Sequence, residues 1–339
     1  MKVDIKSIGL STSAFGYSMG NVGKNSPRAN AKPWSLEDFI KFSSKHNLGG
    51  VEAPLKRFVP DLDDEYLNKI ESLLIENELF FIMDAESALD IEEIKLLIPL
   101  AKRLKSKIIR IKSSNILSCD RKKLGMPWRE HINRCKNVLM QIAPILREEN
   151  LKIAIENHQD LDSNDLLEVL EKVGSDVIGV NFDIGNAFAT CEDPITFAEK
   201  VGSSVLNIHL KDYKIFKSQE GFRLVRCALG DGAVDFEKIL PLLAKNSPDA
   251  KMVIELGALE SRNIAYFSSE FWSHIQPRAE VERKNFSEIL DRITPQLESE
   301  SWQTPWEEGK EQREILGLEA AQFEKSLSYI QYYESTSQI

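Results

Sequence analysis

Eight short apolar runs, each separated from the next by a longer amphipathic segment, constrain the fold of this chain more than any other feature. The runs are rich in Val, Ile, Leu or Phe, as expected for strands that are buried on both faces. They are Ile5–Leu10, Gly50–Ala53, Leu79–Met83, Lys107–Ile111, Leu151–Ile155, Val177–Phe182, Val205–Ile208 and Lys251–Ile254. Strands that alternate with helices form parallel βαβ units, and eight such units close a (β/α)8 barrel.

The segments between the runs have the spacing and the capping residues of helices. Ser35, Ser163 and Asp235 stand where three of these helices are expected to begin. The expected helices are Ser35–His46, Asp64–Glu78, Ile91–Leu104, Trp128–Glu149, Ser163–Val173, Pro194–Lys200 and Asp235–Lys245. A doubly wound open sheet is the alternative, but no G-x-G-x-x-G motif follows the first run. We therefore predict the α/β class and a (β/α)8 TIM barrel.

The regular alternation stops near Leu256. Residues 262–310 are rich in aromatic, proline and charged residues, and a final amphipathic helix is expected from about Lys310 to Tyr333. We predict a catalytic barrel domain over residues 1–262 and a C-terminal helical extension over residues 263–339. The extension either packs on the barrel or forms a dimer arm, and the sequence does not distinguish the two.

Charge and cysteine usage exclude several classes of partner. The chain has 43 basic and 53 acidic residues, for a formal net charge of −10, which gives no general attraction for nucleic acids or anionic membranes. Residues 1–10 lack the apolar core of a signal peptide, and no apolar stretch approaches the roughly 20 residues of a membrane helix. The four cysteines show no C-x-x-C spacing. We expect a cytoplasmic protein without nucleic-acid or membrane partners, and a homo-oligomer stays open.

The residues that follow the predicted strands indicate a metal site. In a barrel the end of each strand faces the catalytic mouth. The ends of the second, third and fourth runs carry Glu52, Asp84 with Glu86, and Lys112. The last four ends carry Glu156, Asp183, His209 and Glu255. A charged side chain at the end of a buried strand is costly unless something pairs with it, and a shared divalent cation satisfies all four of the last group.

Each of these residues, taken alone, is equally well explained as the point where a buried strand reaches the surface. Four successive ends that all carry ligand-type side chains favour the metal site. Three carboxylates and one imidazole form an oxygen-rich set, which suits Mn²⁺, Mg²⁺ or Co²⁺ better than a structural Zn²⁺.

Four motifs carry a family resemblance. They are Glu156-Asn157-His158-Gln159-Asp160, Asp183-Ile184-Gly185-Asn186, His209-Leu210-Lys211-Asp212 and the run from Leu229 to Phe236. Their order and spacing resemble the sugar phosphate isomerase/epimerase family of xylose-isomerase-like TIM barrels, over about residues 1–262. The resemblance implies a metal held by the same four residues, and it implies that Glu156 and Glu255 act as an acid/base pair. Many members have a His where Asn186 stands, so a substrate contact or a second metal there is in doubt.

Further candidates lie beside the predicted metal. Side chains at i and i+2 of a strand share a direction, so His158 points as Glu156 does and Lys211 as His209 does. His158 is a candidate proton donor, substrate ligand or partner of Glu156. Lys112 and Lys211 are candidates for holding a substrate carboxylate, phosphate or oxyanion. Arg226 resembles a substrate-contacting basic position of the family. Lys112, Asn186, Lys211 and Arg226 are therefore the predicted substrate-binding residues.

The leading functional hypothesis is a metal-dependent isomerase or epimerase. It acts on a keto- or aldo-sugar, or a sugar derivative, by proton transfer through a metal-stabilised enediolate. A decarboxylase or lyase of a 3-oxo sugar acid uses the same site and is the close alternative. An apurinic-site endonuclease and a non-catalytic sugar-binding barrel are remote ones, because strand-end histidines are few, the chain is acidic and the ligand set is intact.

Overall fold

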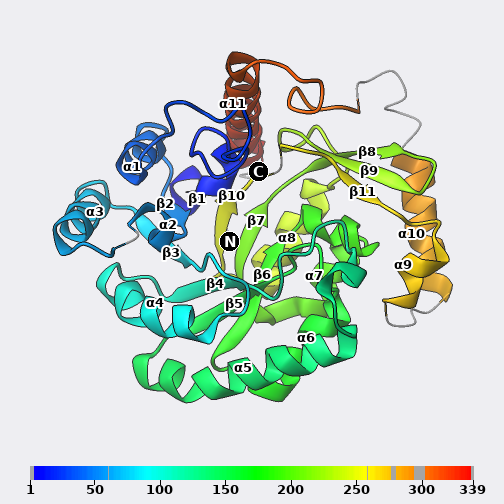
Figure 1. The fold of residues 1–339 in the computed structure, drawn as a ribbon, viewed down its shortest axis with the longest axis horizontal. Coiled ribbons are helices and arrows are strands. Elements are labelled where there is room, and N and C mark those ends of the chain that lie inside the picture. Colours follow the sequence, from blue (N-terminus) through cyan, green and yellow to red (C-terminus); the bar gives the residue numbers. More distant parts are fainter. Residues whose placement is uncertain (1–3, 60, 258, 276–279, 294–301, 337–339) are drawn as a thin grey trace.

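Eight parallel strands close into a barrel in the computed structural model, which describes residues 4–59, 61–257, 259–275, 280–293 and 302–336 (Figure 1). The strands are β1 (Ile8–Ser11), β2 (Gly50–Ala53), β3 (Phe80–Asp84), β4 (Ile108–Lys112), β5 (Lys152–Glu156), β6 (Ile178–Asp183), β7 (Val205–Leu210) and β10 (Lys251–Ile254). Each strand pairs with the next, and β1 pairs with both β2 and β10, which closes the ring. The predicted (β/α)8 barrel is confirmed.

The helices that surround the barrel follow the predicted segments closely. They are α1 (Leu36–Lys45), α2 (Leu55–Phe58), α3 (Asp64–Glu76), α4 (Ile91–Arg103), α5 (Trp128–Glu149), α6 (Ser163–Val173), α7 (Pro194–Val201) and α8 (Phe236–Asn246). Ser35 caps α1, since its hydroxyl accepts a hydrogen bond from the backbone N–H of Asp38 at 3.1 Å. For α6 the capping residue is Asp162 rather than the predicted Ser163.

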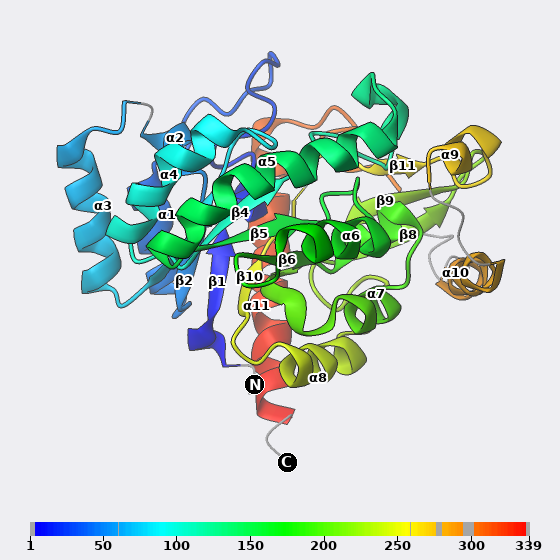
Figure 2. The same cartoon turned by 90° about the horizontal axis from the view of Figure 1, so that it is seen from below.

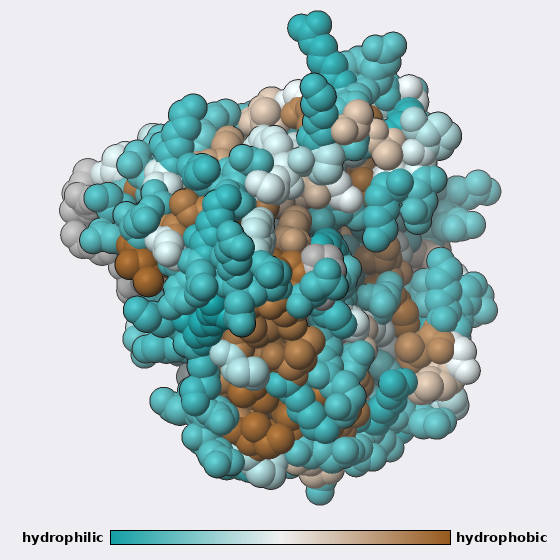
Figure 3. All heavy atoms as spheres, turned by 60° about the vertical axis from the view of Figure 1, so that its left-hand side comes forward, coloured by the Kyte–Doolittle hydropathy of each residue, from teal (hydrophilic) through white to brown (hydrophobic). Residues whose placement is uncertain are grey.

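The outer surface is polar where the helices meet solvent. Figure 3 shows the side that carries α1 and α3, which is mostly hydrophilic, with apolar side chains gathered in its lower half. In the part of the chain that the structure describes, no helix combines the length and the apolar character needed to cross a bilayer.

A small antiparallel sheet beside the barrel was not predicted. It consists of β8 (Tyr213–Lys217), β9 (Phe222–Arg226) and β11 (Arg262–Ile264), in the order β11-β9-β8. The segments of β8 and β9 alternate in polarity and are joined by a short turn, which is typical of a hairpin. This pattern differs from the continuous apolar runs that predicted the parallel strands, so β8 and β9 were not predicted. The first residue of β11 is also the last residue of the predicted barrel domain.

The C-terminal extension contains α9 (Ser269–Ser273), α10 (Glu280–Ile293) and α11 (Gln312–Thr336), of which only the last helix was predicted. Helix α11 runs alongside β1 and the first helix of the barrel (Figures 1 and 2). The Phe323 ring lies 5.3 Å from that of Phe15 and 5.2 Å from that of Phe42, between ring centroids. This helix therefore packs on the barrel. The domain boundary at residue 262 and a role as a dimer arm stay predictions.

Candidate active site

The four side chains predicted to bind a metal form one buried cluster at the carboxyl end of the barrel. Glu156 ends β5, Asp183 ends β6, His209 lies near the end of β7, and Glu255 directly follows β10. The strand register places Asp183 opposite His209. One ligand atom of each residue lies within 4.8 Å of the others, and no member of the cluster is more than 5% exposed.

His209 turns its two ring nitrogens toward different carboxylates. Nδ1 lies 2.8 Å from Oε2 of Glu255, and 3.9 Å from the nearest oxygens of both Glu156 and Asp183. Nε2 lies 2.9 Å from Oε1 of Glu52. Burial opposes protonation of this imidazole, but the carboxylates of Glu52 and Glu255 raise the pKa of His209 well above its ordinary value. Nδ1 is thus the ring nitrogen that faces the other three side chains of the cluster, and Nε2 is oriented by Glu52.

Two cationic side chains lie against the carboxylates of the cluster. Lys211 donates hydrogen bonds from Nζ to Oδ2 of Asp183 at 2.6 Å and pairs with Oε1 of Glu255 at 2.7 Å. Arg110 pairs with Asp84 at 2.6 Å through Nη1 and with Glu156 through Nη2. Burial opposes the charge on Glu255, but Lys211 and His209 hold the pKa of this carboxyl well below its ordinary value. Glu255 is therefore ionised at neutral pH.

The composition of the cluster fits a divalent cation. The cluster and the charged groups in contact with it hold five carboxylates and three cationic groups when His209 is protonated, which leaves a formal excess of two negative charges. Carboxylate oxygens and an imidazole nitrogen are ligands of Mn²⁺, Mg²⁺ and Co²⁺. Metal bonds of about 2.1 Å place two ligand atoms at most about 4.2 Å apart, so small side-chain shifts from the observed separations suffice. The five carboxylates are those of Glu52, Asp84, Glu156, Asp183 and Glu255.

Asn186 holds the Asp183 carboxylate in place. Its backbone N–H donates to Oδ1 of Asp183 at 3.2 Å, and its side-chain amide donates to Oδ2 at 2.7 Å. Asn157 fixes the backbone of Asp183 through two further hydrogen bonds of 2.7 and 2.9 Å. Asn186, which the sequence analysis predicts to bind substrate, therefore contacts a carboxylate of the cluster in this structure, and its contact with substrate stays a prediction.

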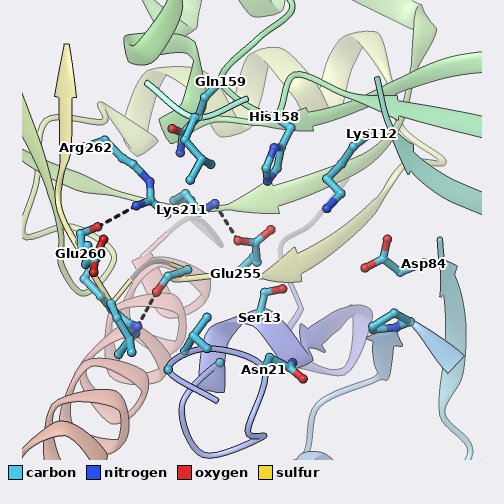
Figure 4. Close-up of a pocket in the computed structure, with 18 of the residues that line it drawn as sticks. Ser13, Asn21, Asp84, Lys112, His158, Gln159, Lys211, Glu255, Glu260 and Arg262 are labelled. Atoms are coloured by element: carbon cyan, nitrogen blue, oxygen red, sulfur yellow. Dashed lines mark hydrogen bonds and ion pairs between the residues drawn. The ribbon is translucent and has the colours of Figure 1, made fainter. Parts of the chain in front are cut away.

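A cavity of about 710 Å³ opens above the cluster (Figure 4). Lys112, His158 and Lys211 all line it, together with Glu255. His158 and Lys112 point into it from the same side (Figure 4). Burial, together with the charges of Lys112 and Arg110, lowers the pKa of His158 well below its ordinary value, so this imidazole is neutral.

Lys112 is a half-buried cation of this cavity that has few protein partners. Its Nζ donates to Oδ1 of Asn115 at 3.2 Å, and among the described residues no carboxylate lies within ion-pair distance of it. Burial and the neighbouring Arg110 lower the pKa of Lys112. Arg226, in contrast, is already engaged. Its guanidinium donates to Gln322 at 2.6 Å, to the carbonyl of Gly257, and to that of Ala14 at 3.3 Å.

Three residues with clear roles in the site were not assigned by the sequence analysis. Glu52 was noted at a strand end without a function, although it orients His209. Arg110 stands two residues before Lys112 on the same strand, a spacing that was available but was not used. Glu319 of α11 lines the cavity, and nothing in the sequence links it to residues about 300 positions away.

The chain is similar in sequence and in fold to several known proteins. A family model described as a xylose isomerase-like TIM barrel matches residues 40–265, more than half of the chain. A curated relative, 3-oxo-isoapionate decarboxylase from Pectobacterium atrosepticum, is 28% identical over 121 residues. That match covers 35% of this chain and 44% of the relative, so less than half of the decarboxylase is compared.

Two solved structures are similar in fold. The IolI protein with a bound zinc atom has a TM-score of 0.56 at 15% identity, over 84% of this chain and 98% of that one. D-psicose 3-epimerase crystallised in the presence of D-fructose has a TM-score of 0.57 at 11% identity, with the same coverages of 84% and 98%. At such identities the likeness concerns the fold alone.

Proposed function

Because this chain belongs to the xylose isomerase-like TIM-barrel family, as its motifs predicted, we propose that it is a divalent-metal-dependent sugar isomerase or epimerase. Its substrate is a keto- or aldo-sugar, or a derivative of one. The observation that carries the proposal is the cluster of Glu156, Asp183, His209 and Glu255 at the floor of a cavity of about 710 Å³. Similarity in fold to an epimerase is in keeping with it.

The four residues of the cluster would hold the metal. When bound, a divalent cation supplies Lewis-acid stabilisation of the negative charge that develops on two adjacent substrate oxygens. The oxygen-rich donor set favours Mn²⁺, Mg²⁺ or Co²⁺. Zinc suits the set less well, although one protein of the same fold binds it. Elemental analysis of the purified protein identifies the metal.

The protein's part in the reaction is to move a proton next to a carbonyl. We assign this to the carboxylates of Glu255, which lines the cavity, and of Glu156, which belongs to the same cluster and ends a different strand. The low pKa of Glu255 keeps it ionised, which is the form of a carboxylate that can accept a proton. Glu156, in its protonated form, then delivers a different proton to the opposite face of the same carbon, which inverts that carbon, while Glu255 keeps the proton it removed until solvent takes it. Return of the proton to the neighbouring carbon moves the carbonyl instead.

The remaining candidates orient the substrate. His158 is neutral and lines the cavity, so one of its nitrogens can donate a hydrogen bond to a substrate oxygen and the other can accept one. Lys112 and Lys211 supply positive charge near the reacting oxygens. Arg226 lines the same cavity, whereas Asn186 acts through the Asp183 carboxylate that it holds. A cytoplasmic location, a homo-oligomeric state and the absence of nucleic-acid partners remain predictions from composition.

Incubation with candidate ketoses and aldoses in D2O tests the proposal. An isomerase or epimerase of this kind labilises the C–H bond next to the carbonyl, so recovered sugar gains solvent deuterium at that carbon. Mass spectrometry and NMR locate the label. Exchange that needs added divalent metal and disappears in EDTA is the expected result. No exchange with any sugar of the panel by fully metal-loaded protein would overturn the isomerase and epimerase assignment.

One observation favours a second candidate function. Lys112 is a half-buried cation without a carboxylate partner among the described residues, and it faces the same cavity, as a binding group for a substrate carboxylate would. A curated relative is a decarboxylase of a 3-oxo acid. In that reaction the C–C bond to the carboxylate breaks, CO2 leaves, and a proton takes its place. Release of CO2 from a 3-oxo sugar acid distinguishes this candidate from the first.

Replacing Glu52 by Gln is expected to weaken metal binding by about 10–100-fold, as is typical when the partner of a ligating imidazole is lost. The variant keeps the shape of the side chain but removes the charge that orients Nε2 of His209. Titration of the metal-free protein with Mn²⁺ measures the change. Glu199, an exposed residue of α7, provides the matched control Glu199→Gln. Unchanged affinity in Glu52→Gln would show that Glu52 does not position the ligand.

A further inference from the structure

The loop between β1 and α1, residues 12–34, forms one wall of the cavity and is held by the C-terminal helix. Glu319 of α11 is fully buried, and its carboxylate accepts hydrogen bonds from the backbone N–H groups of Tyr17 at 2.8 Å and Ser18 at 2.9 Å. The Ser18 hydroxyl donates to the same carboxylate at 2.7 Å. A buried carboxylate with three donors is a strong fixed contact. The extension therefore fixes the conformation of a loop that is distant in sequence.

A second contact fixes the outer part of the same loop. The guanidinium of Arg28 lies 4.0 Å from the centre of the Trp306 ring and donates to the carbonyl of Trp306 at 2.8 Å. The Cβ of any residue other than glycine at position 23 would lie 2.9 Å from that ring. In Figures 1 and 2 the loop lies beside the segment that leads into α11. The loop is thus held at both ends by the extension.

Asn21 is the residue of this loop whose side chain is left without partners. Both polar atoms of its amide, Nδ2 and Oδ1, are shielded from solvent, and neither has a hydrogen-bond partner among the described residues. Asn21 lines the cavity and lies across it from His158 and Lys112 (Figure 4). A shielded amide without partners is unfavourable by about 1–3 kcal/mol per group. Such a group in the wall of a binding cavity is explained if a ligand supplies the missing partners.

We propose that Asn21 is a substrate-binding residue, and that it hydrogen-bonds hydroxyl groups of a polyhydroxy chain on the side of the cavity opposite His158 and Lys112. An amide offers one acceptor and two N–H donors, which matches adjacent hydroxyls, each able to donate and accept. Glu319 is the positioning residue that holds the loop so that the amide faces the cavity. The inference rests on the proposed function for the identity of the ligand as a sugar-like chain.

Calorimetric binding of xylitol and sorbitol to the metal-loaded protein tests the inference without any turnover. Asn21→Ala is expected to weaken binding of both alditols by about 10-fold or more, as expected when a hydrogen-bonding group of a site is lost. Asn137→Ala, at an exposed position of α5, is the matched control and leaves binding unchanged. Unchanged alditol affinity in Asn21→Ala, or no alditol binding to the wild-type protein, would refute the proposal.

Glu319→Gln separates positioning from simple loss of structure. It is expected to weaken alditol binding and to leave the Mn²⁺ affinity unchanged, with Glu314→Gln on the exposed side of α11 as its control. Because both residues act through one loop, Asn21→Ala should have little further effect in the Glu319→Gln background. Fully additive effects would contradict the coupling. If the wild-type protein exchanges deuterium but Asn21→Ala binds alditols normally, only this inference is refuted. If Asn21→Ala weakens alditol binding but no sugar exchanges deuterium, only the proposed reaction is refuted.

Discussion

Glu255→Gln is expected to lower the rate of solvent-deuterium exchange by about 10³-fold or more, while the fold survives. Loss of a positioned acid/base group usually decreases the rate by about 10²–10⁴-fold, and this residue is also a proposed metal ligand. The amide is nearly the same size as the carboxylate and still accepts a hydrogen bond from Lys211. Circular dichroism and the melting temperature verify the fold, and exchange is measured at saturating metal.

The variant Asp183→Asn distinguishes the two roles of Glu255. Asp183 is a proposed ligand with no proton-transfer role, so its variant should regain much of its exchange rate as the Mn²⁺ concentration rises. Glu255→Gln should not recover, because metal does not replace a missing base. Wild-type exchange by Glu255→Gln, or its full recovery with metal, would remove Glu255 from the proton-transfer step.

The barrel could be predicted because its signal is local and repeated. A strand buried on both faces is a short apolar run, and most of the amphipathic helices begin at a capping side chain of their own, so each unit is visible by itself. The first strand was extended too far toward the N-terminus, since Ile5–Ser7 forms a 3₁₀ turn before β1. The β8–β9 hairpin was missed because its alternating pattern differs from that of the parallel strands. Its pairing with β11 depends on residues 40 positions further along.

The cluster of ligands was predictable for a related reason. The carboxyl ends of parallel strands meet at one edge, so residues distant in sequence share a place that topology alone defines. The surrounding contacts follow no such rule. Two of these contacts depend on how α11 packs. Gln322 accepts a hydrogen bond from Arg226, and Glu319 holds the loop between β1 and α1. No residue spacing in the chain encodes this packing. The ligand-type side chains on strand ends could therefore be predicted, whereas the contacts supplied by the extension could not.

Arg110→Leu is expected to lower the free energy of unfolding by about 3–5 kcal/mol, the usual cost of removing one partner from a buried ion pair. Arg110 is 5% exposed and pairs with both Asp84 and Glu156, so the variant leaves two buried carboxylates without their cation. Urea unfolding measures the loss. Arg147→Leu, which breaks an exposed pair with Asp176, should leave the unfolding midpoint almost unchanged.

The pH dependence of this loss distinguishes unpaired charge from a packing defect. Burial raises the pKa of Asp84, and Arg110 opposes that effect. Without the guanidinium the pKa of this carboxyl in the folded state rises further above its unfolded value. A group with a raised folded pKa takes up its proton more readily in the folded state, so it favours folding as the pH falls. The difference in the free energy of unfolding between the wild-type protein and Arg110→Leu should therefore become smaller as the pH falls from 7 to 5. A deficit that stays constant over this range would indicate lost packing instead, because a cavity does not titrate.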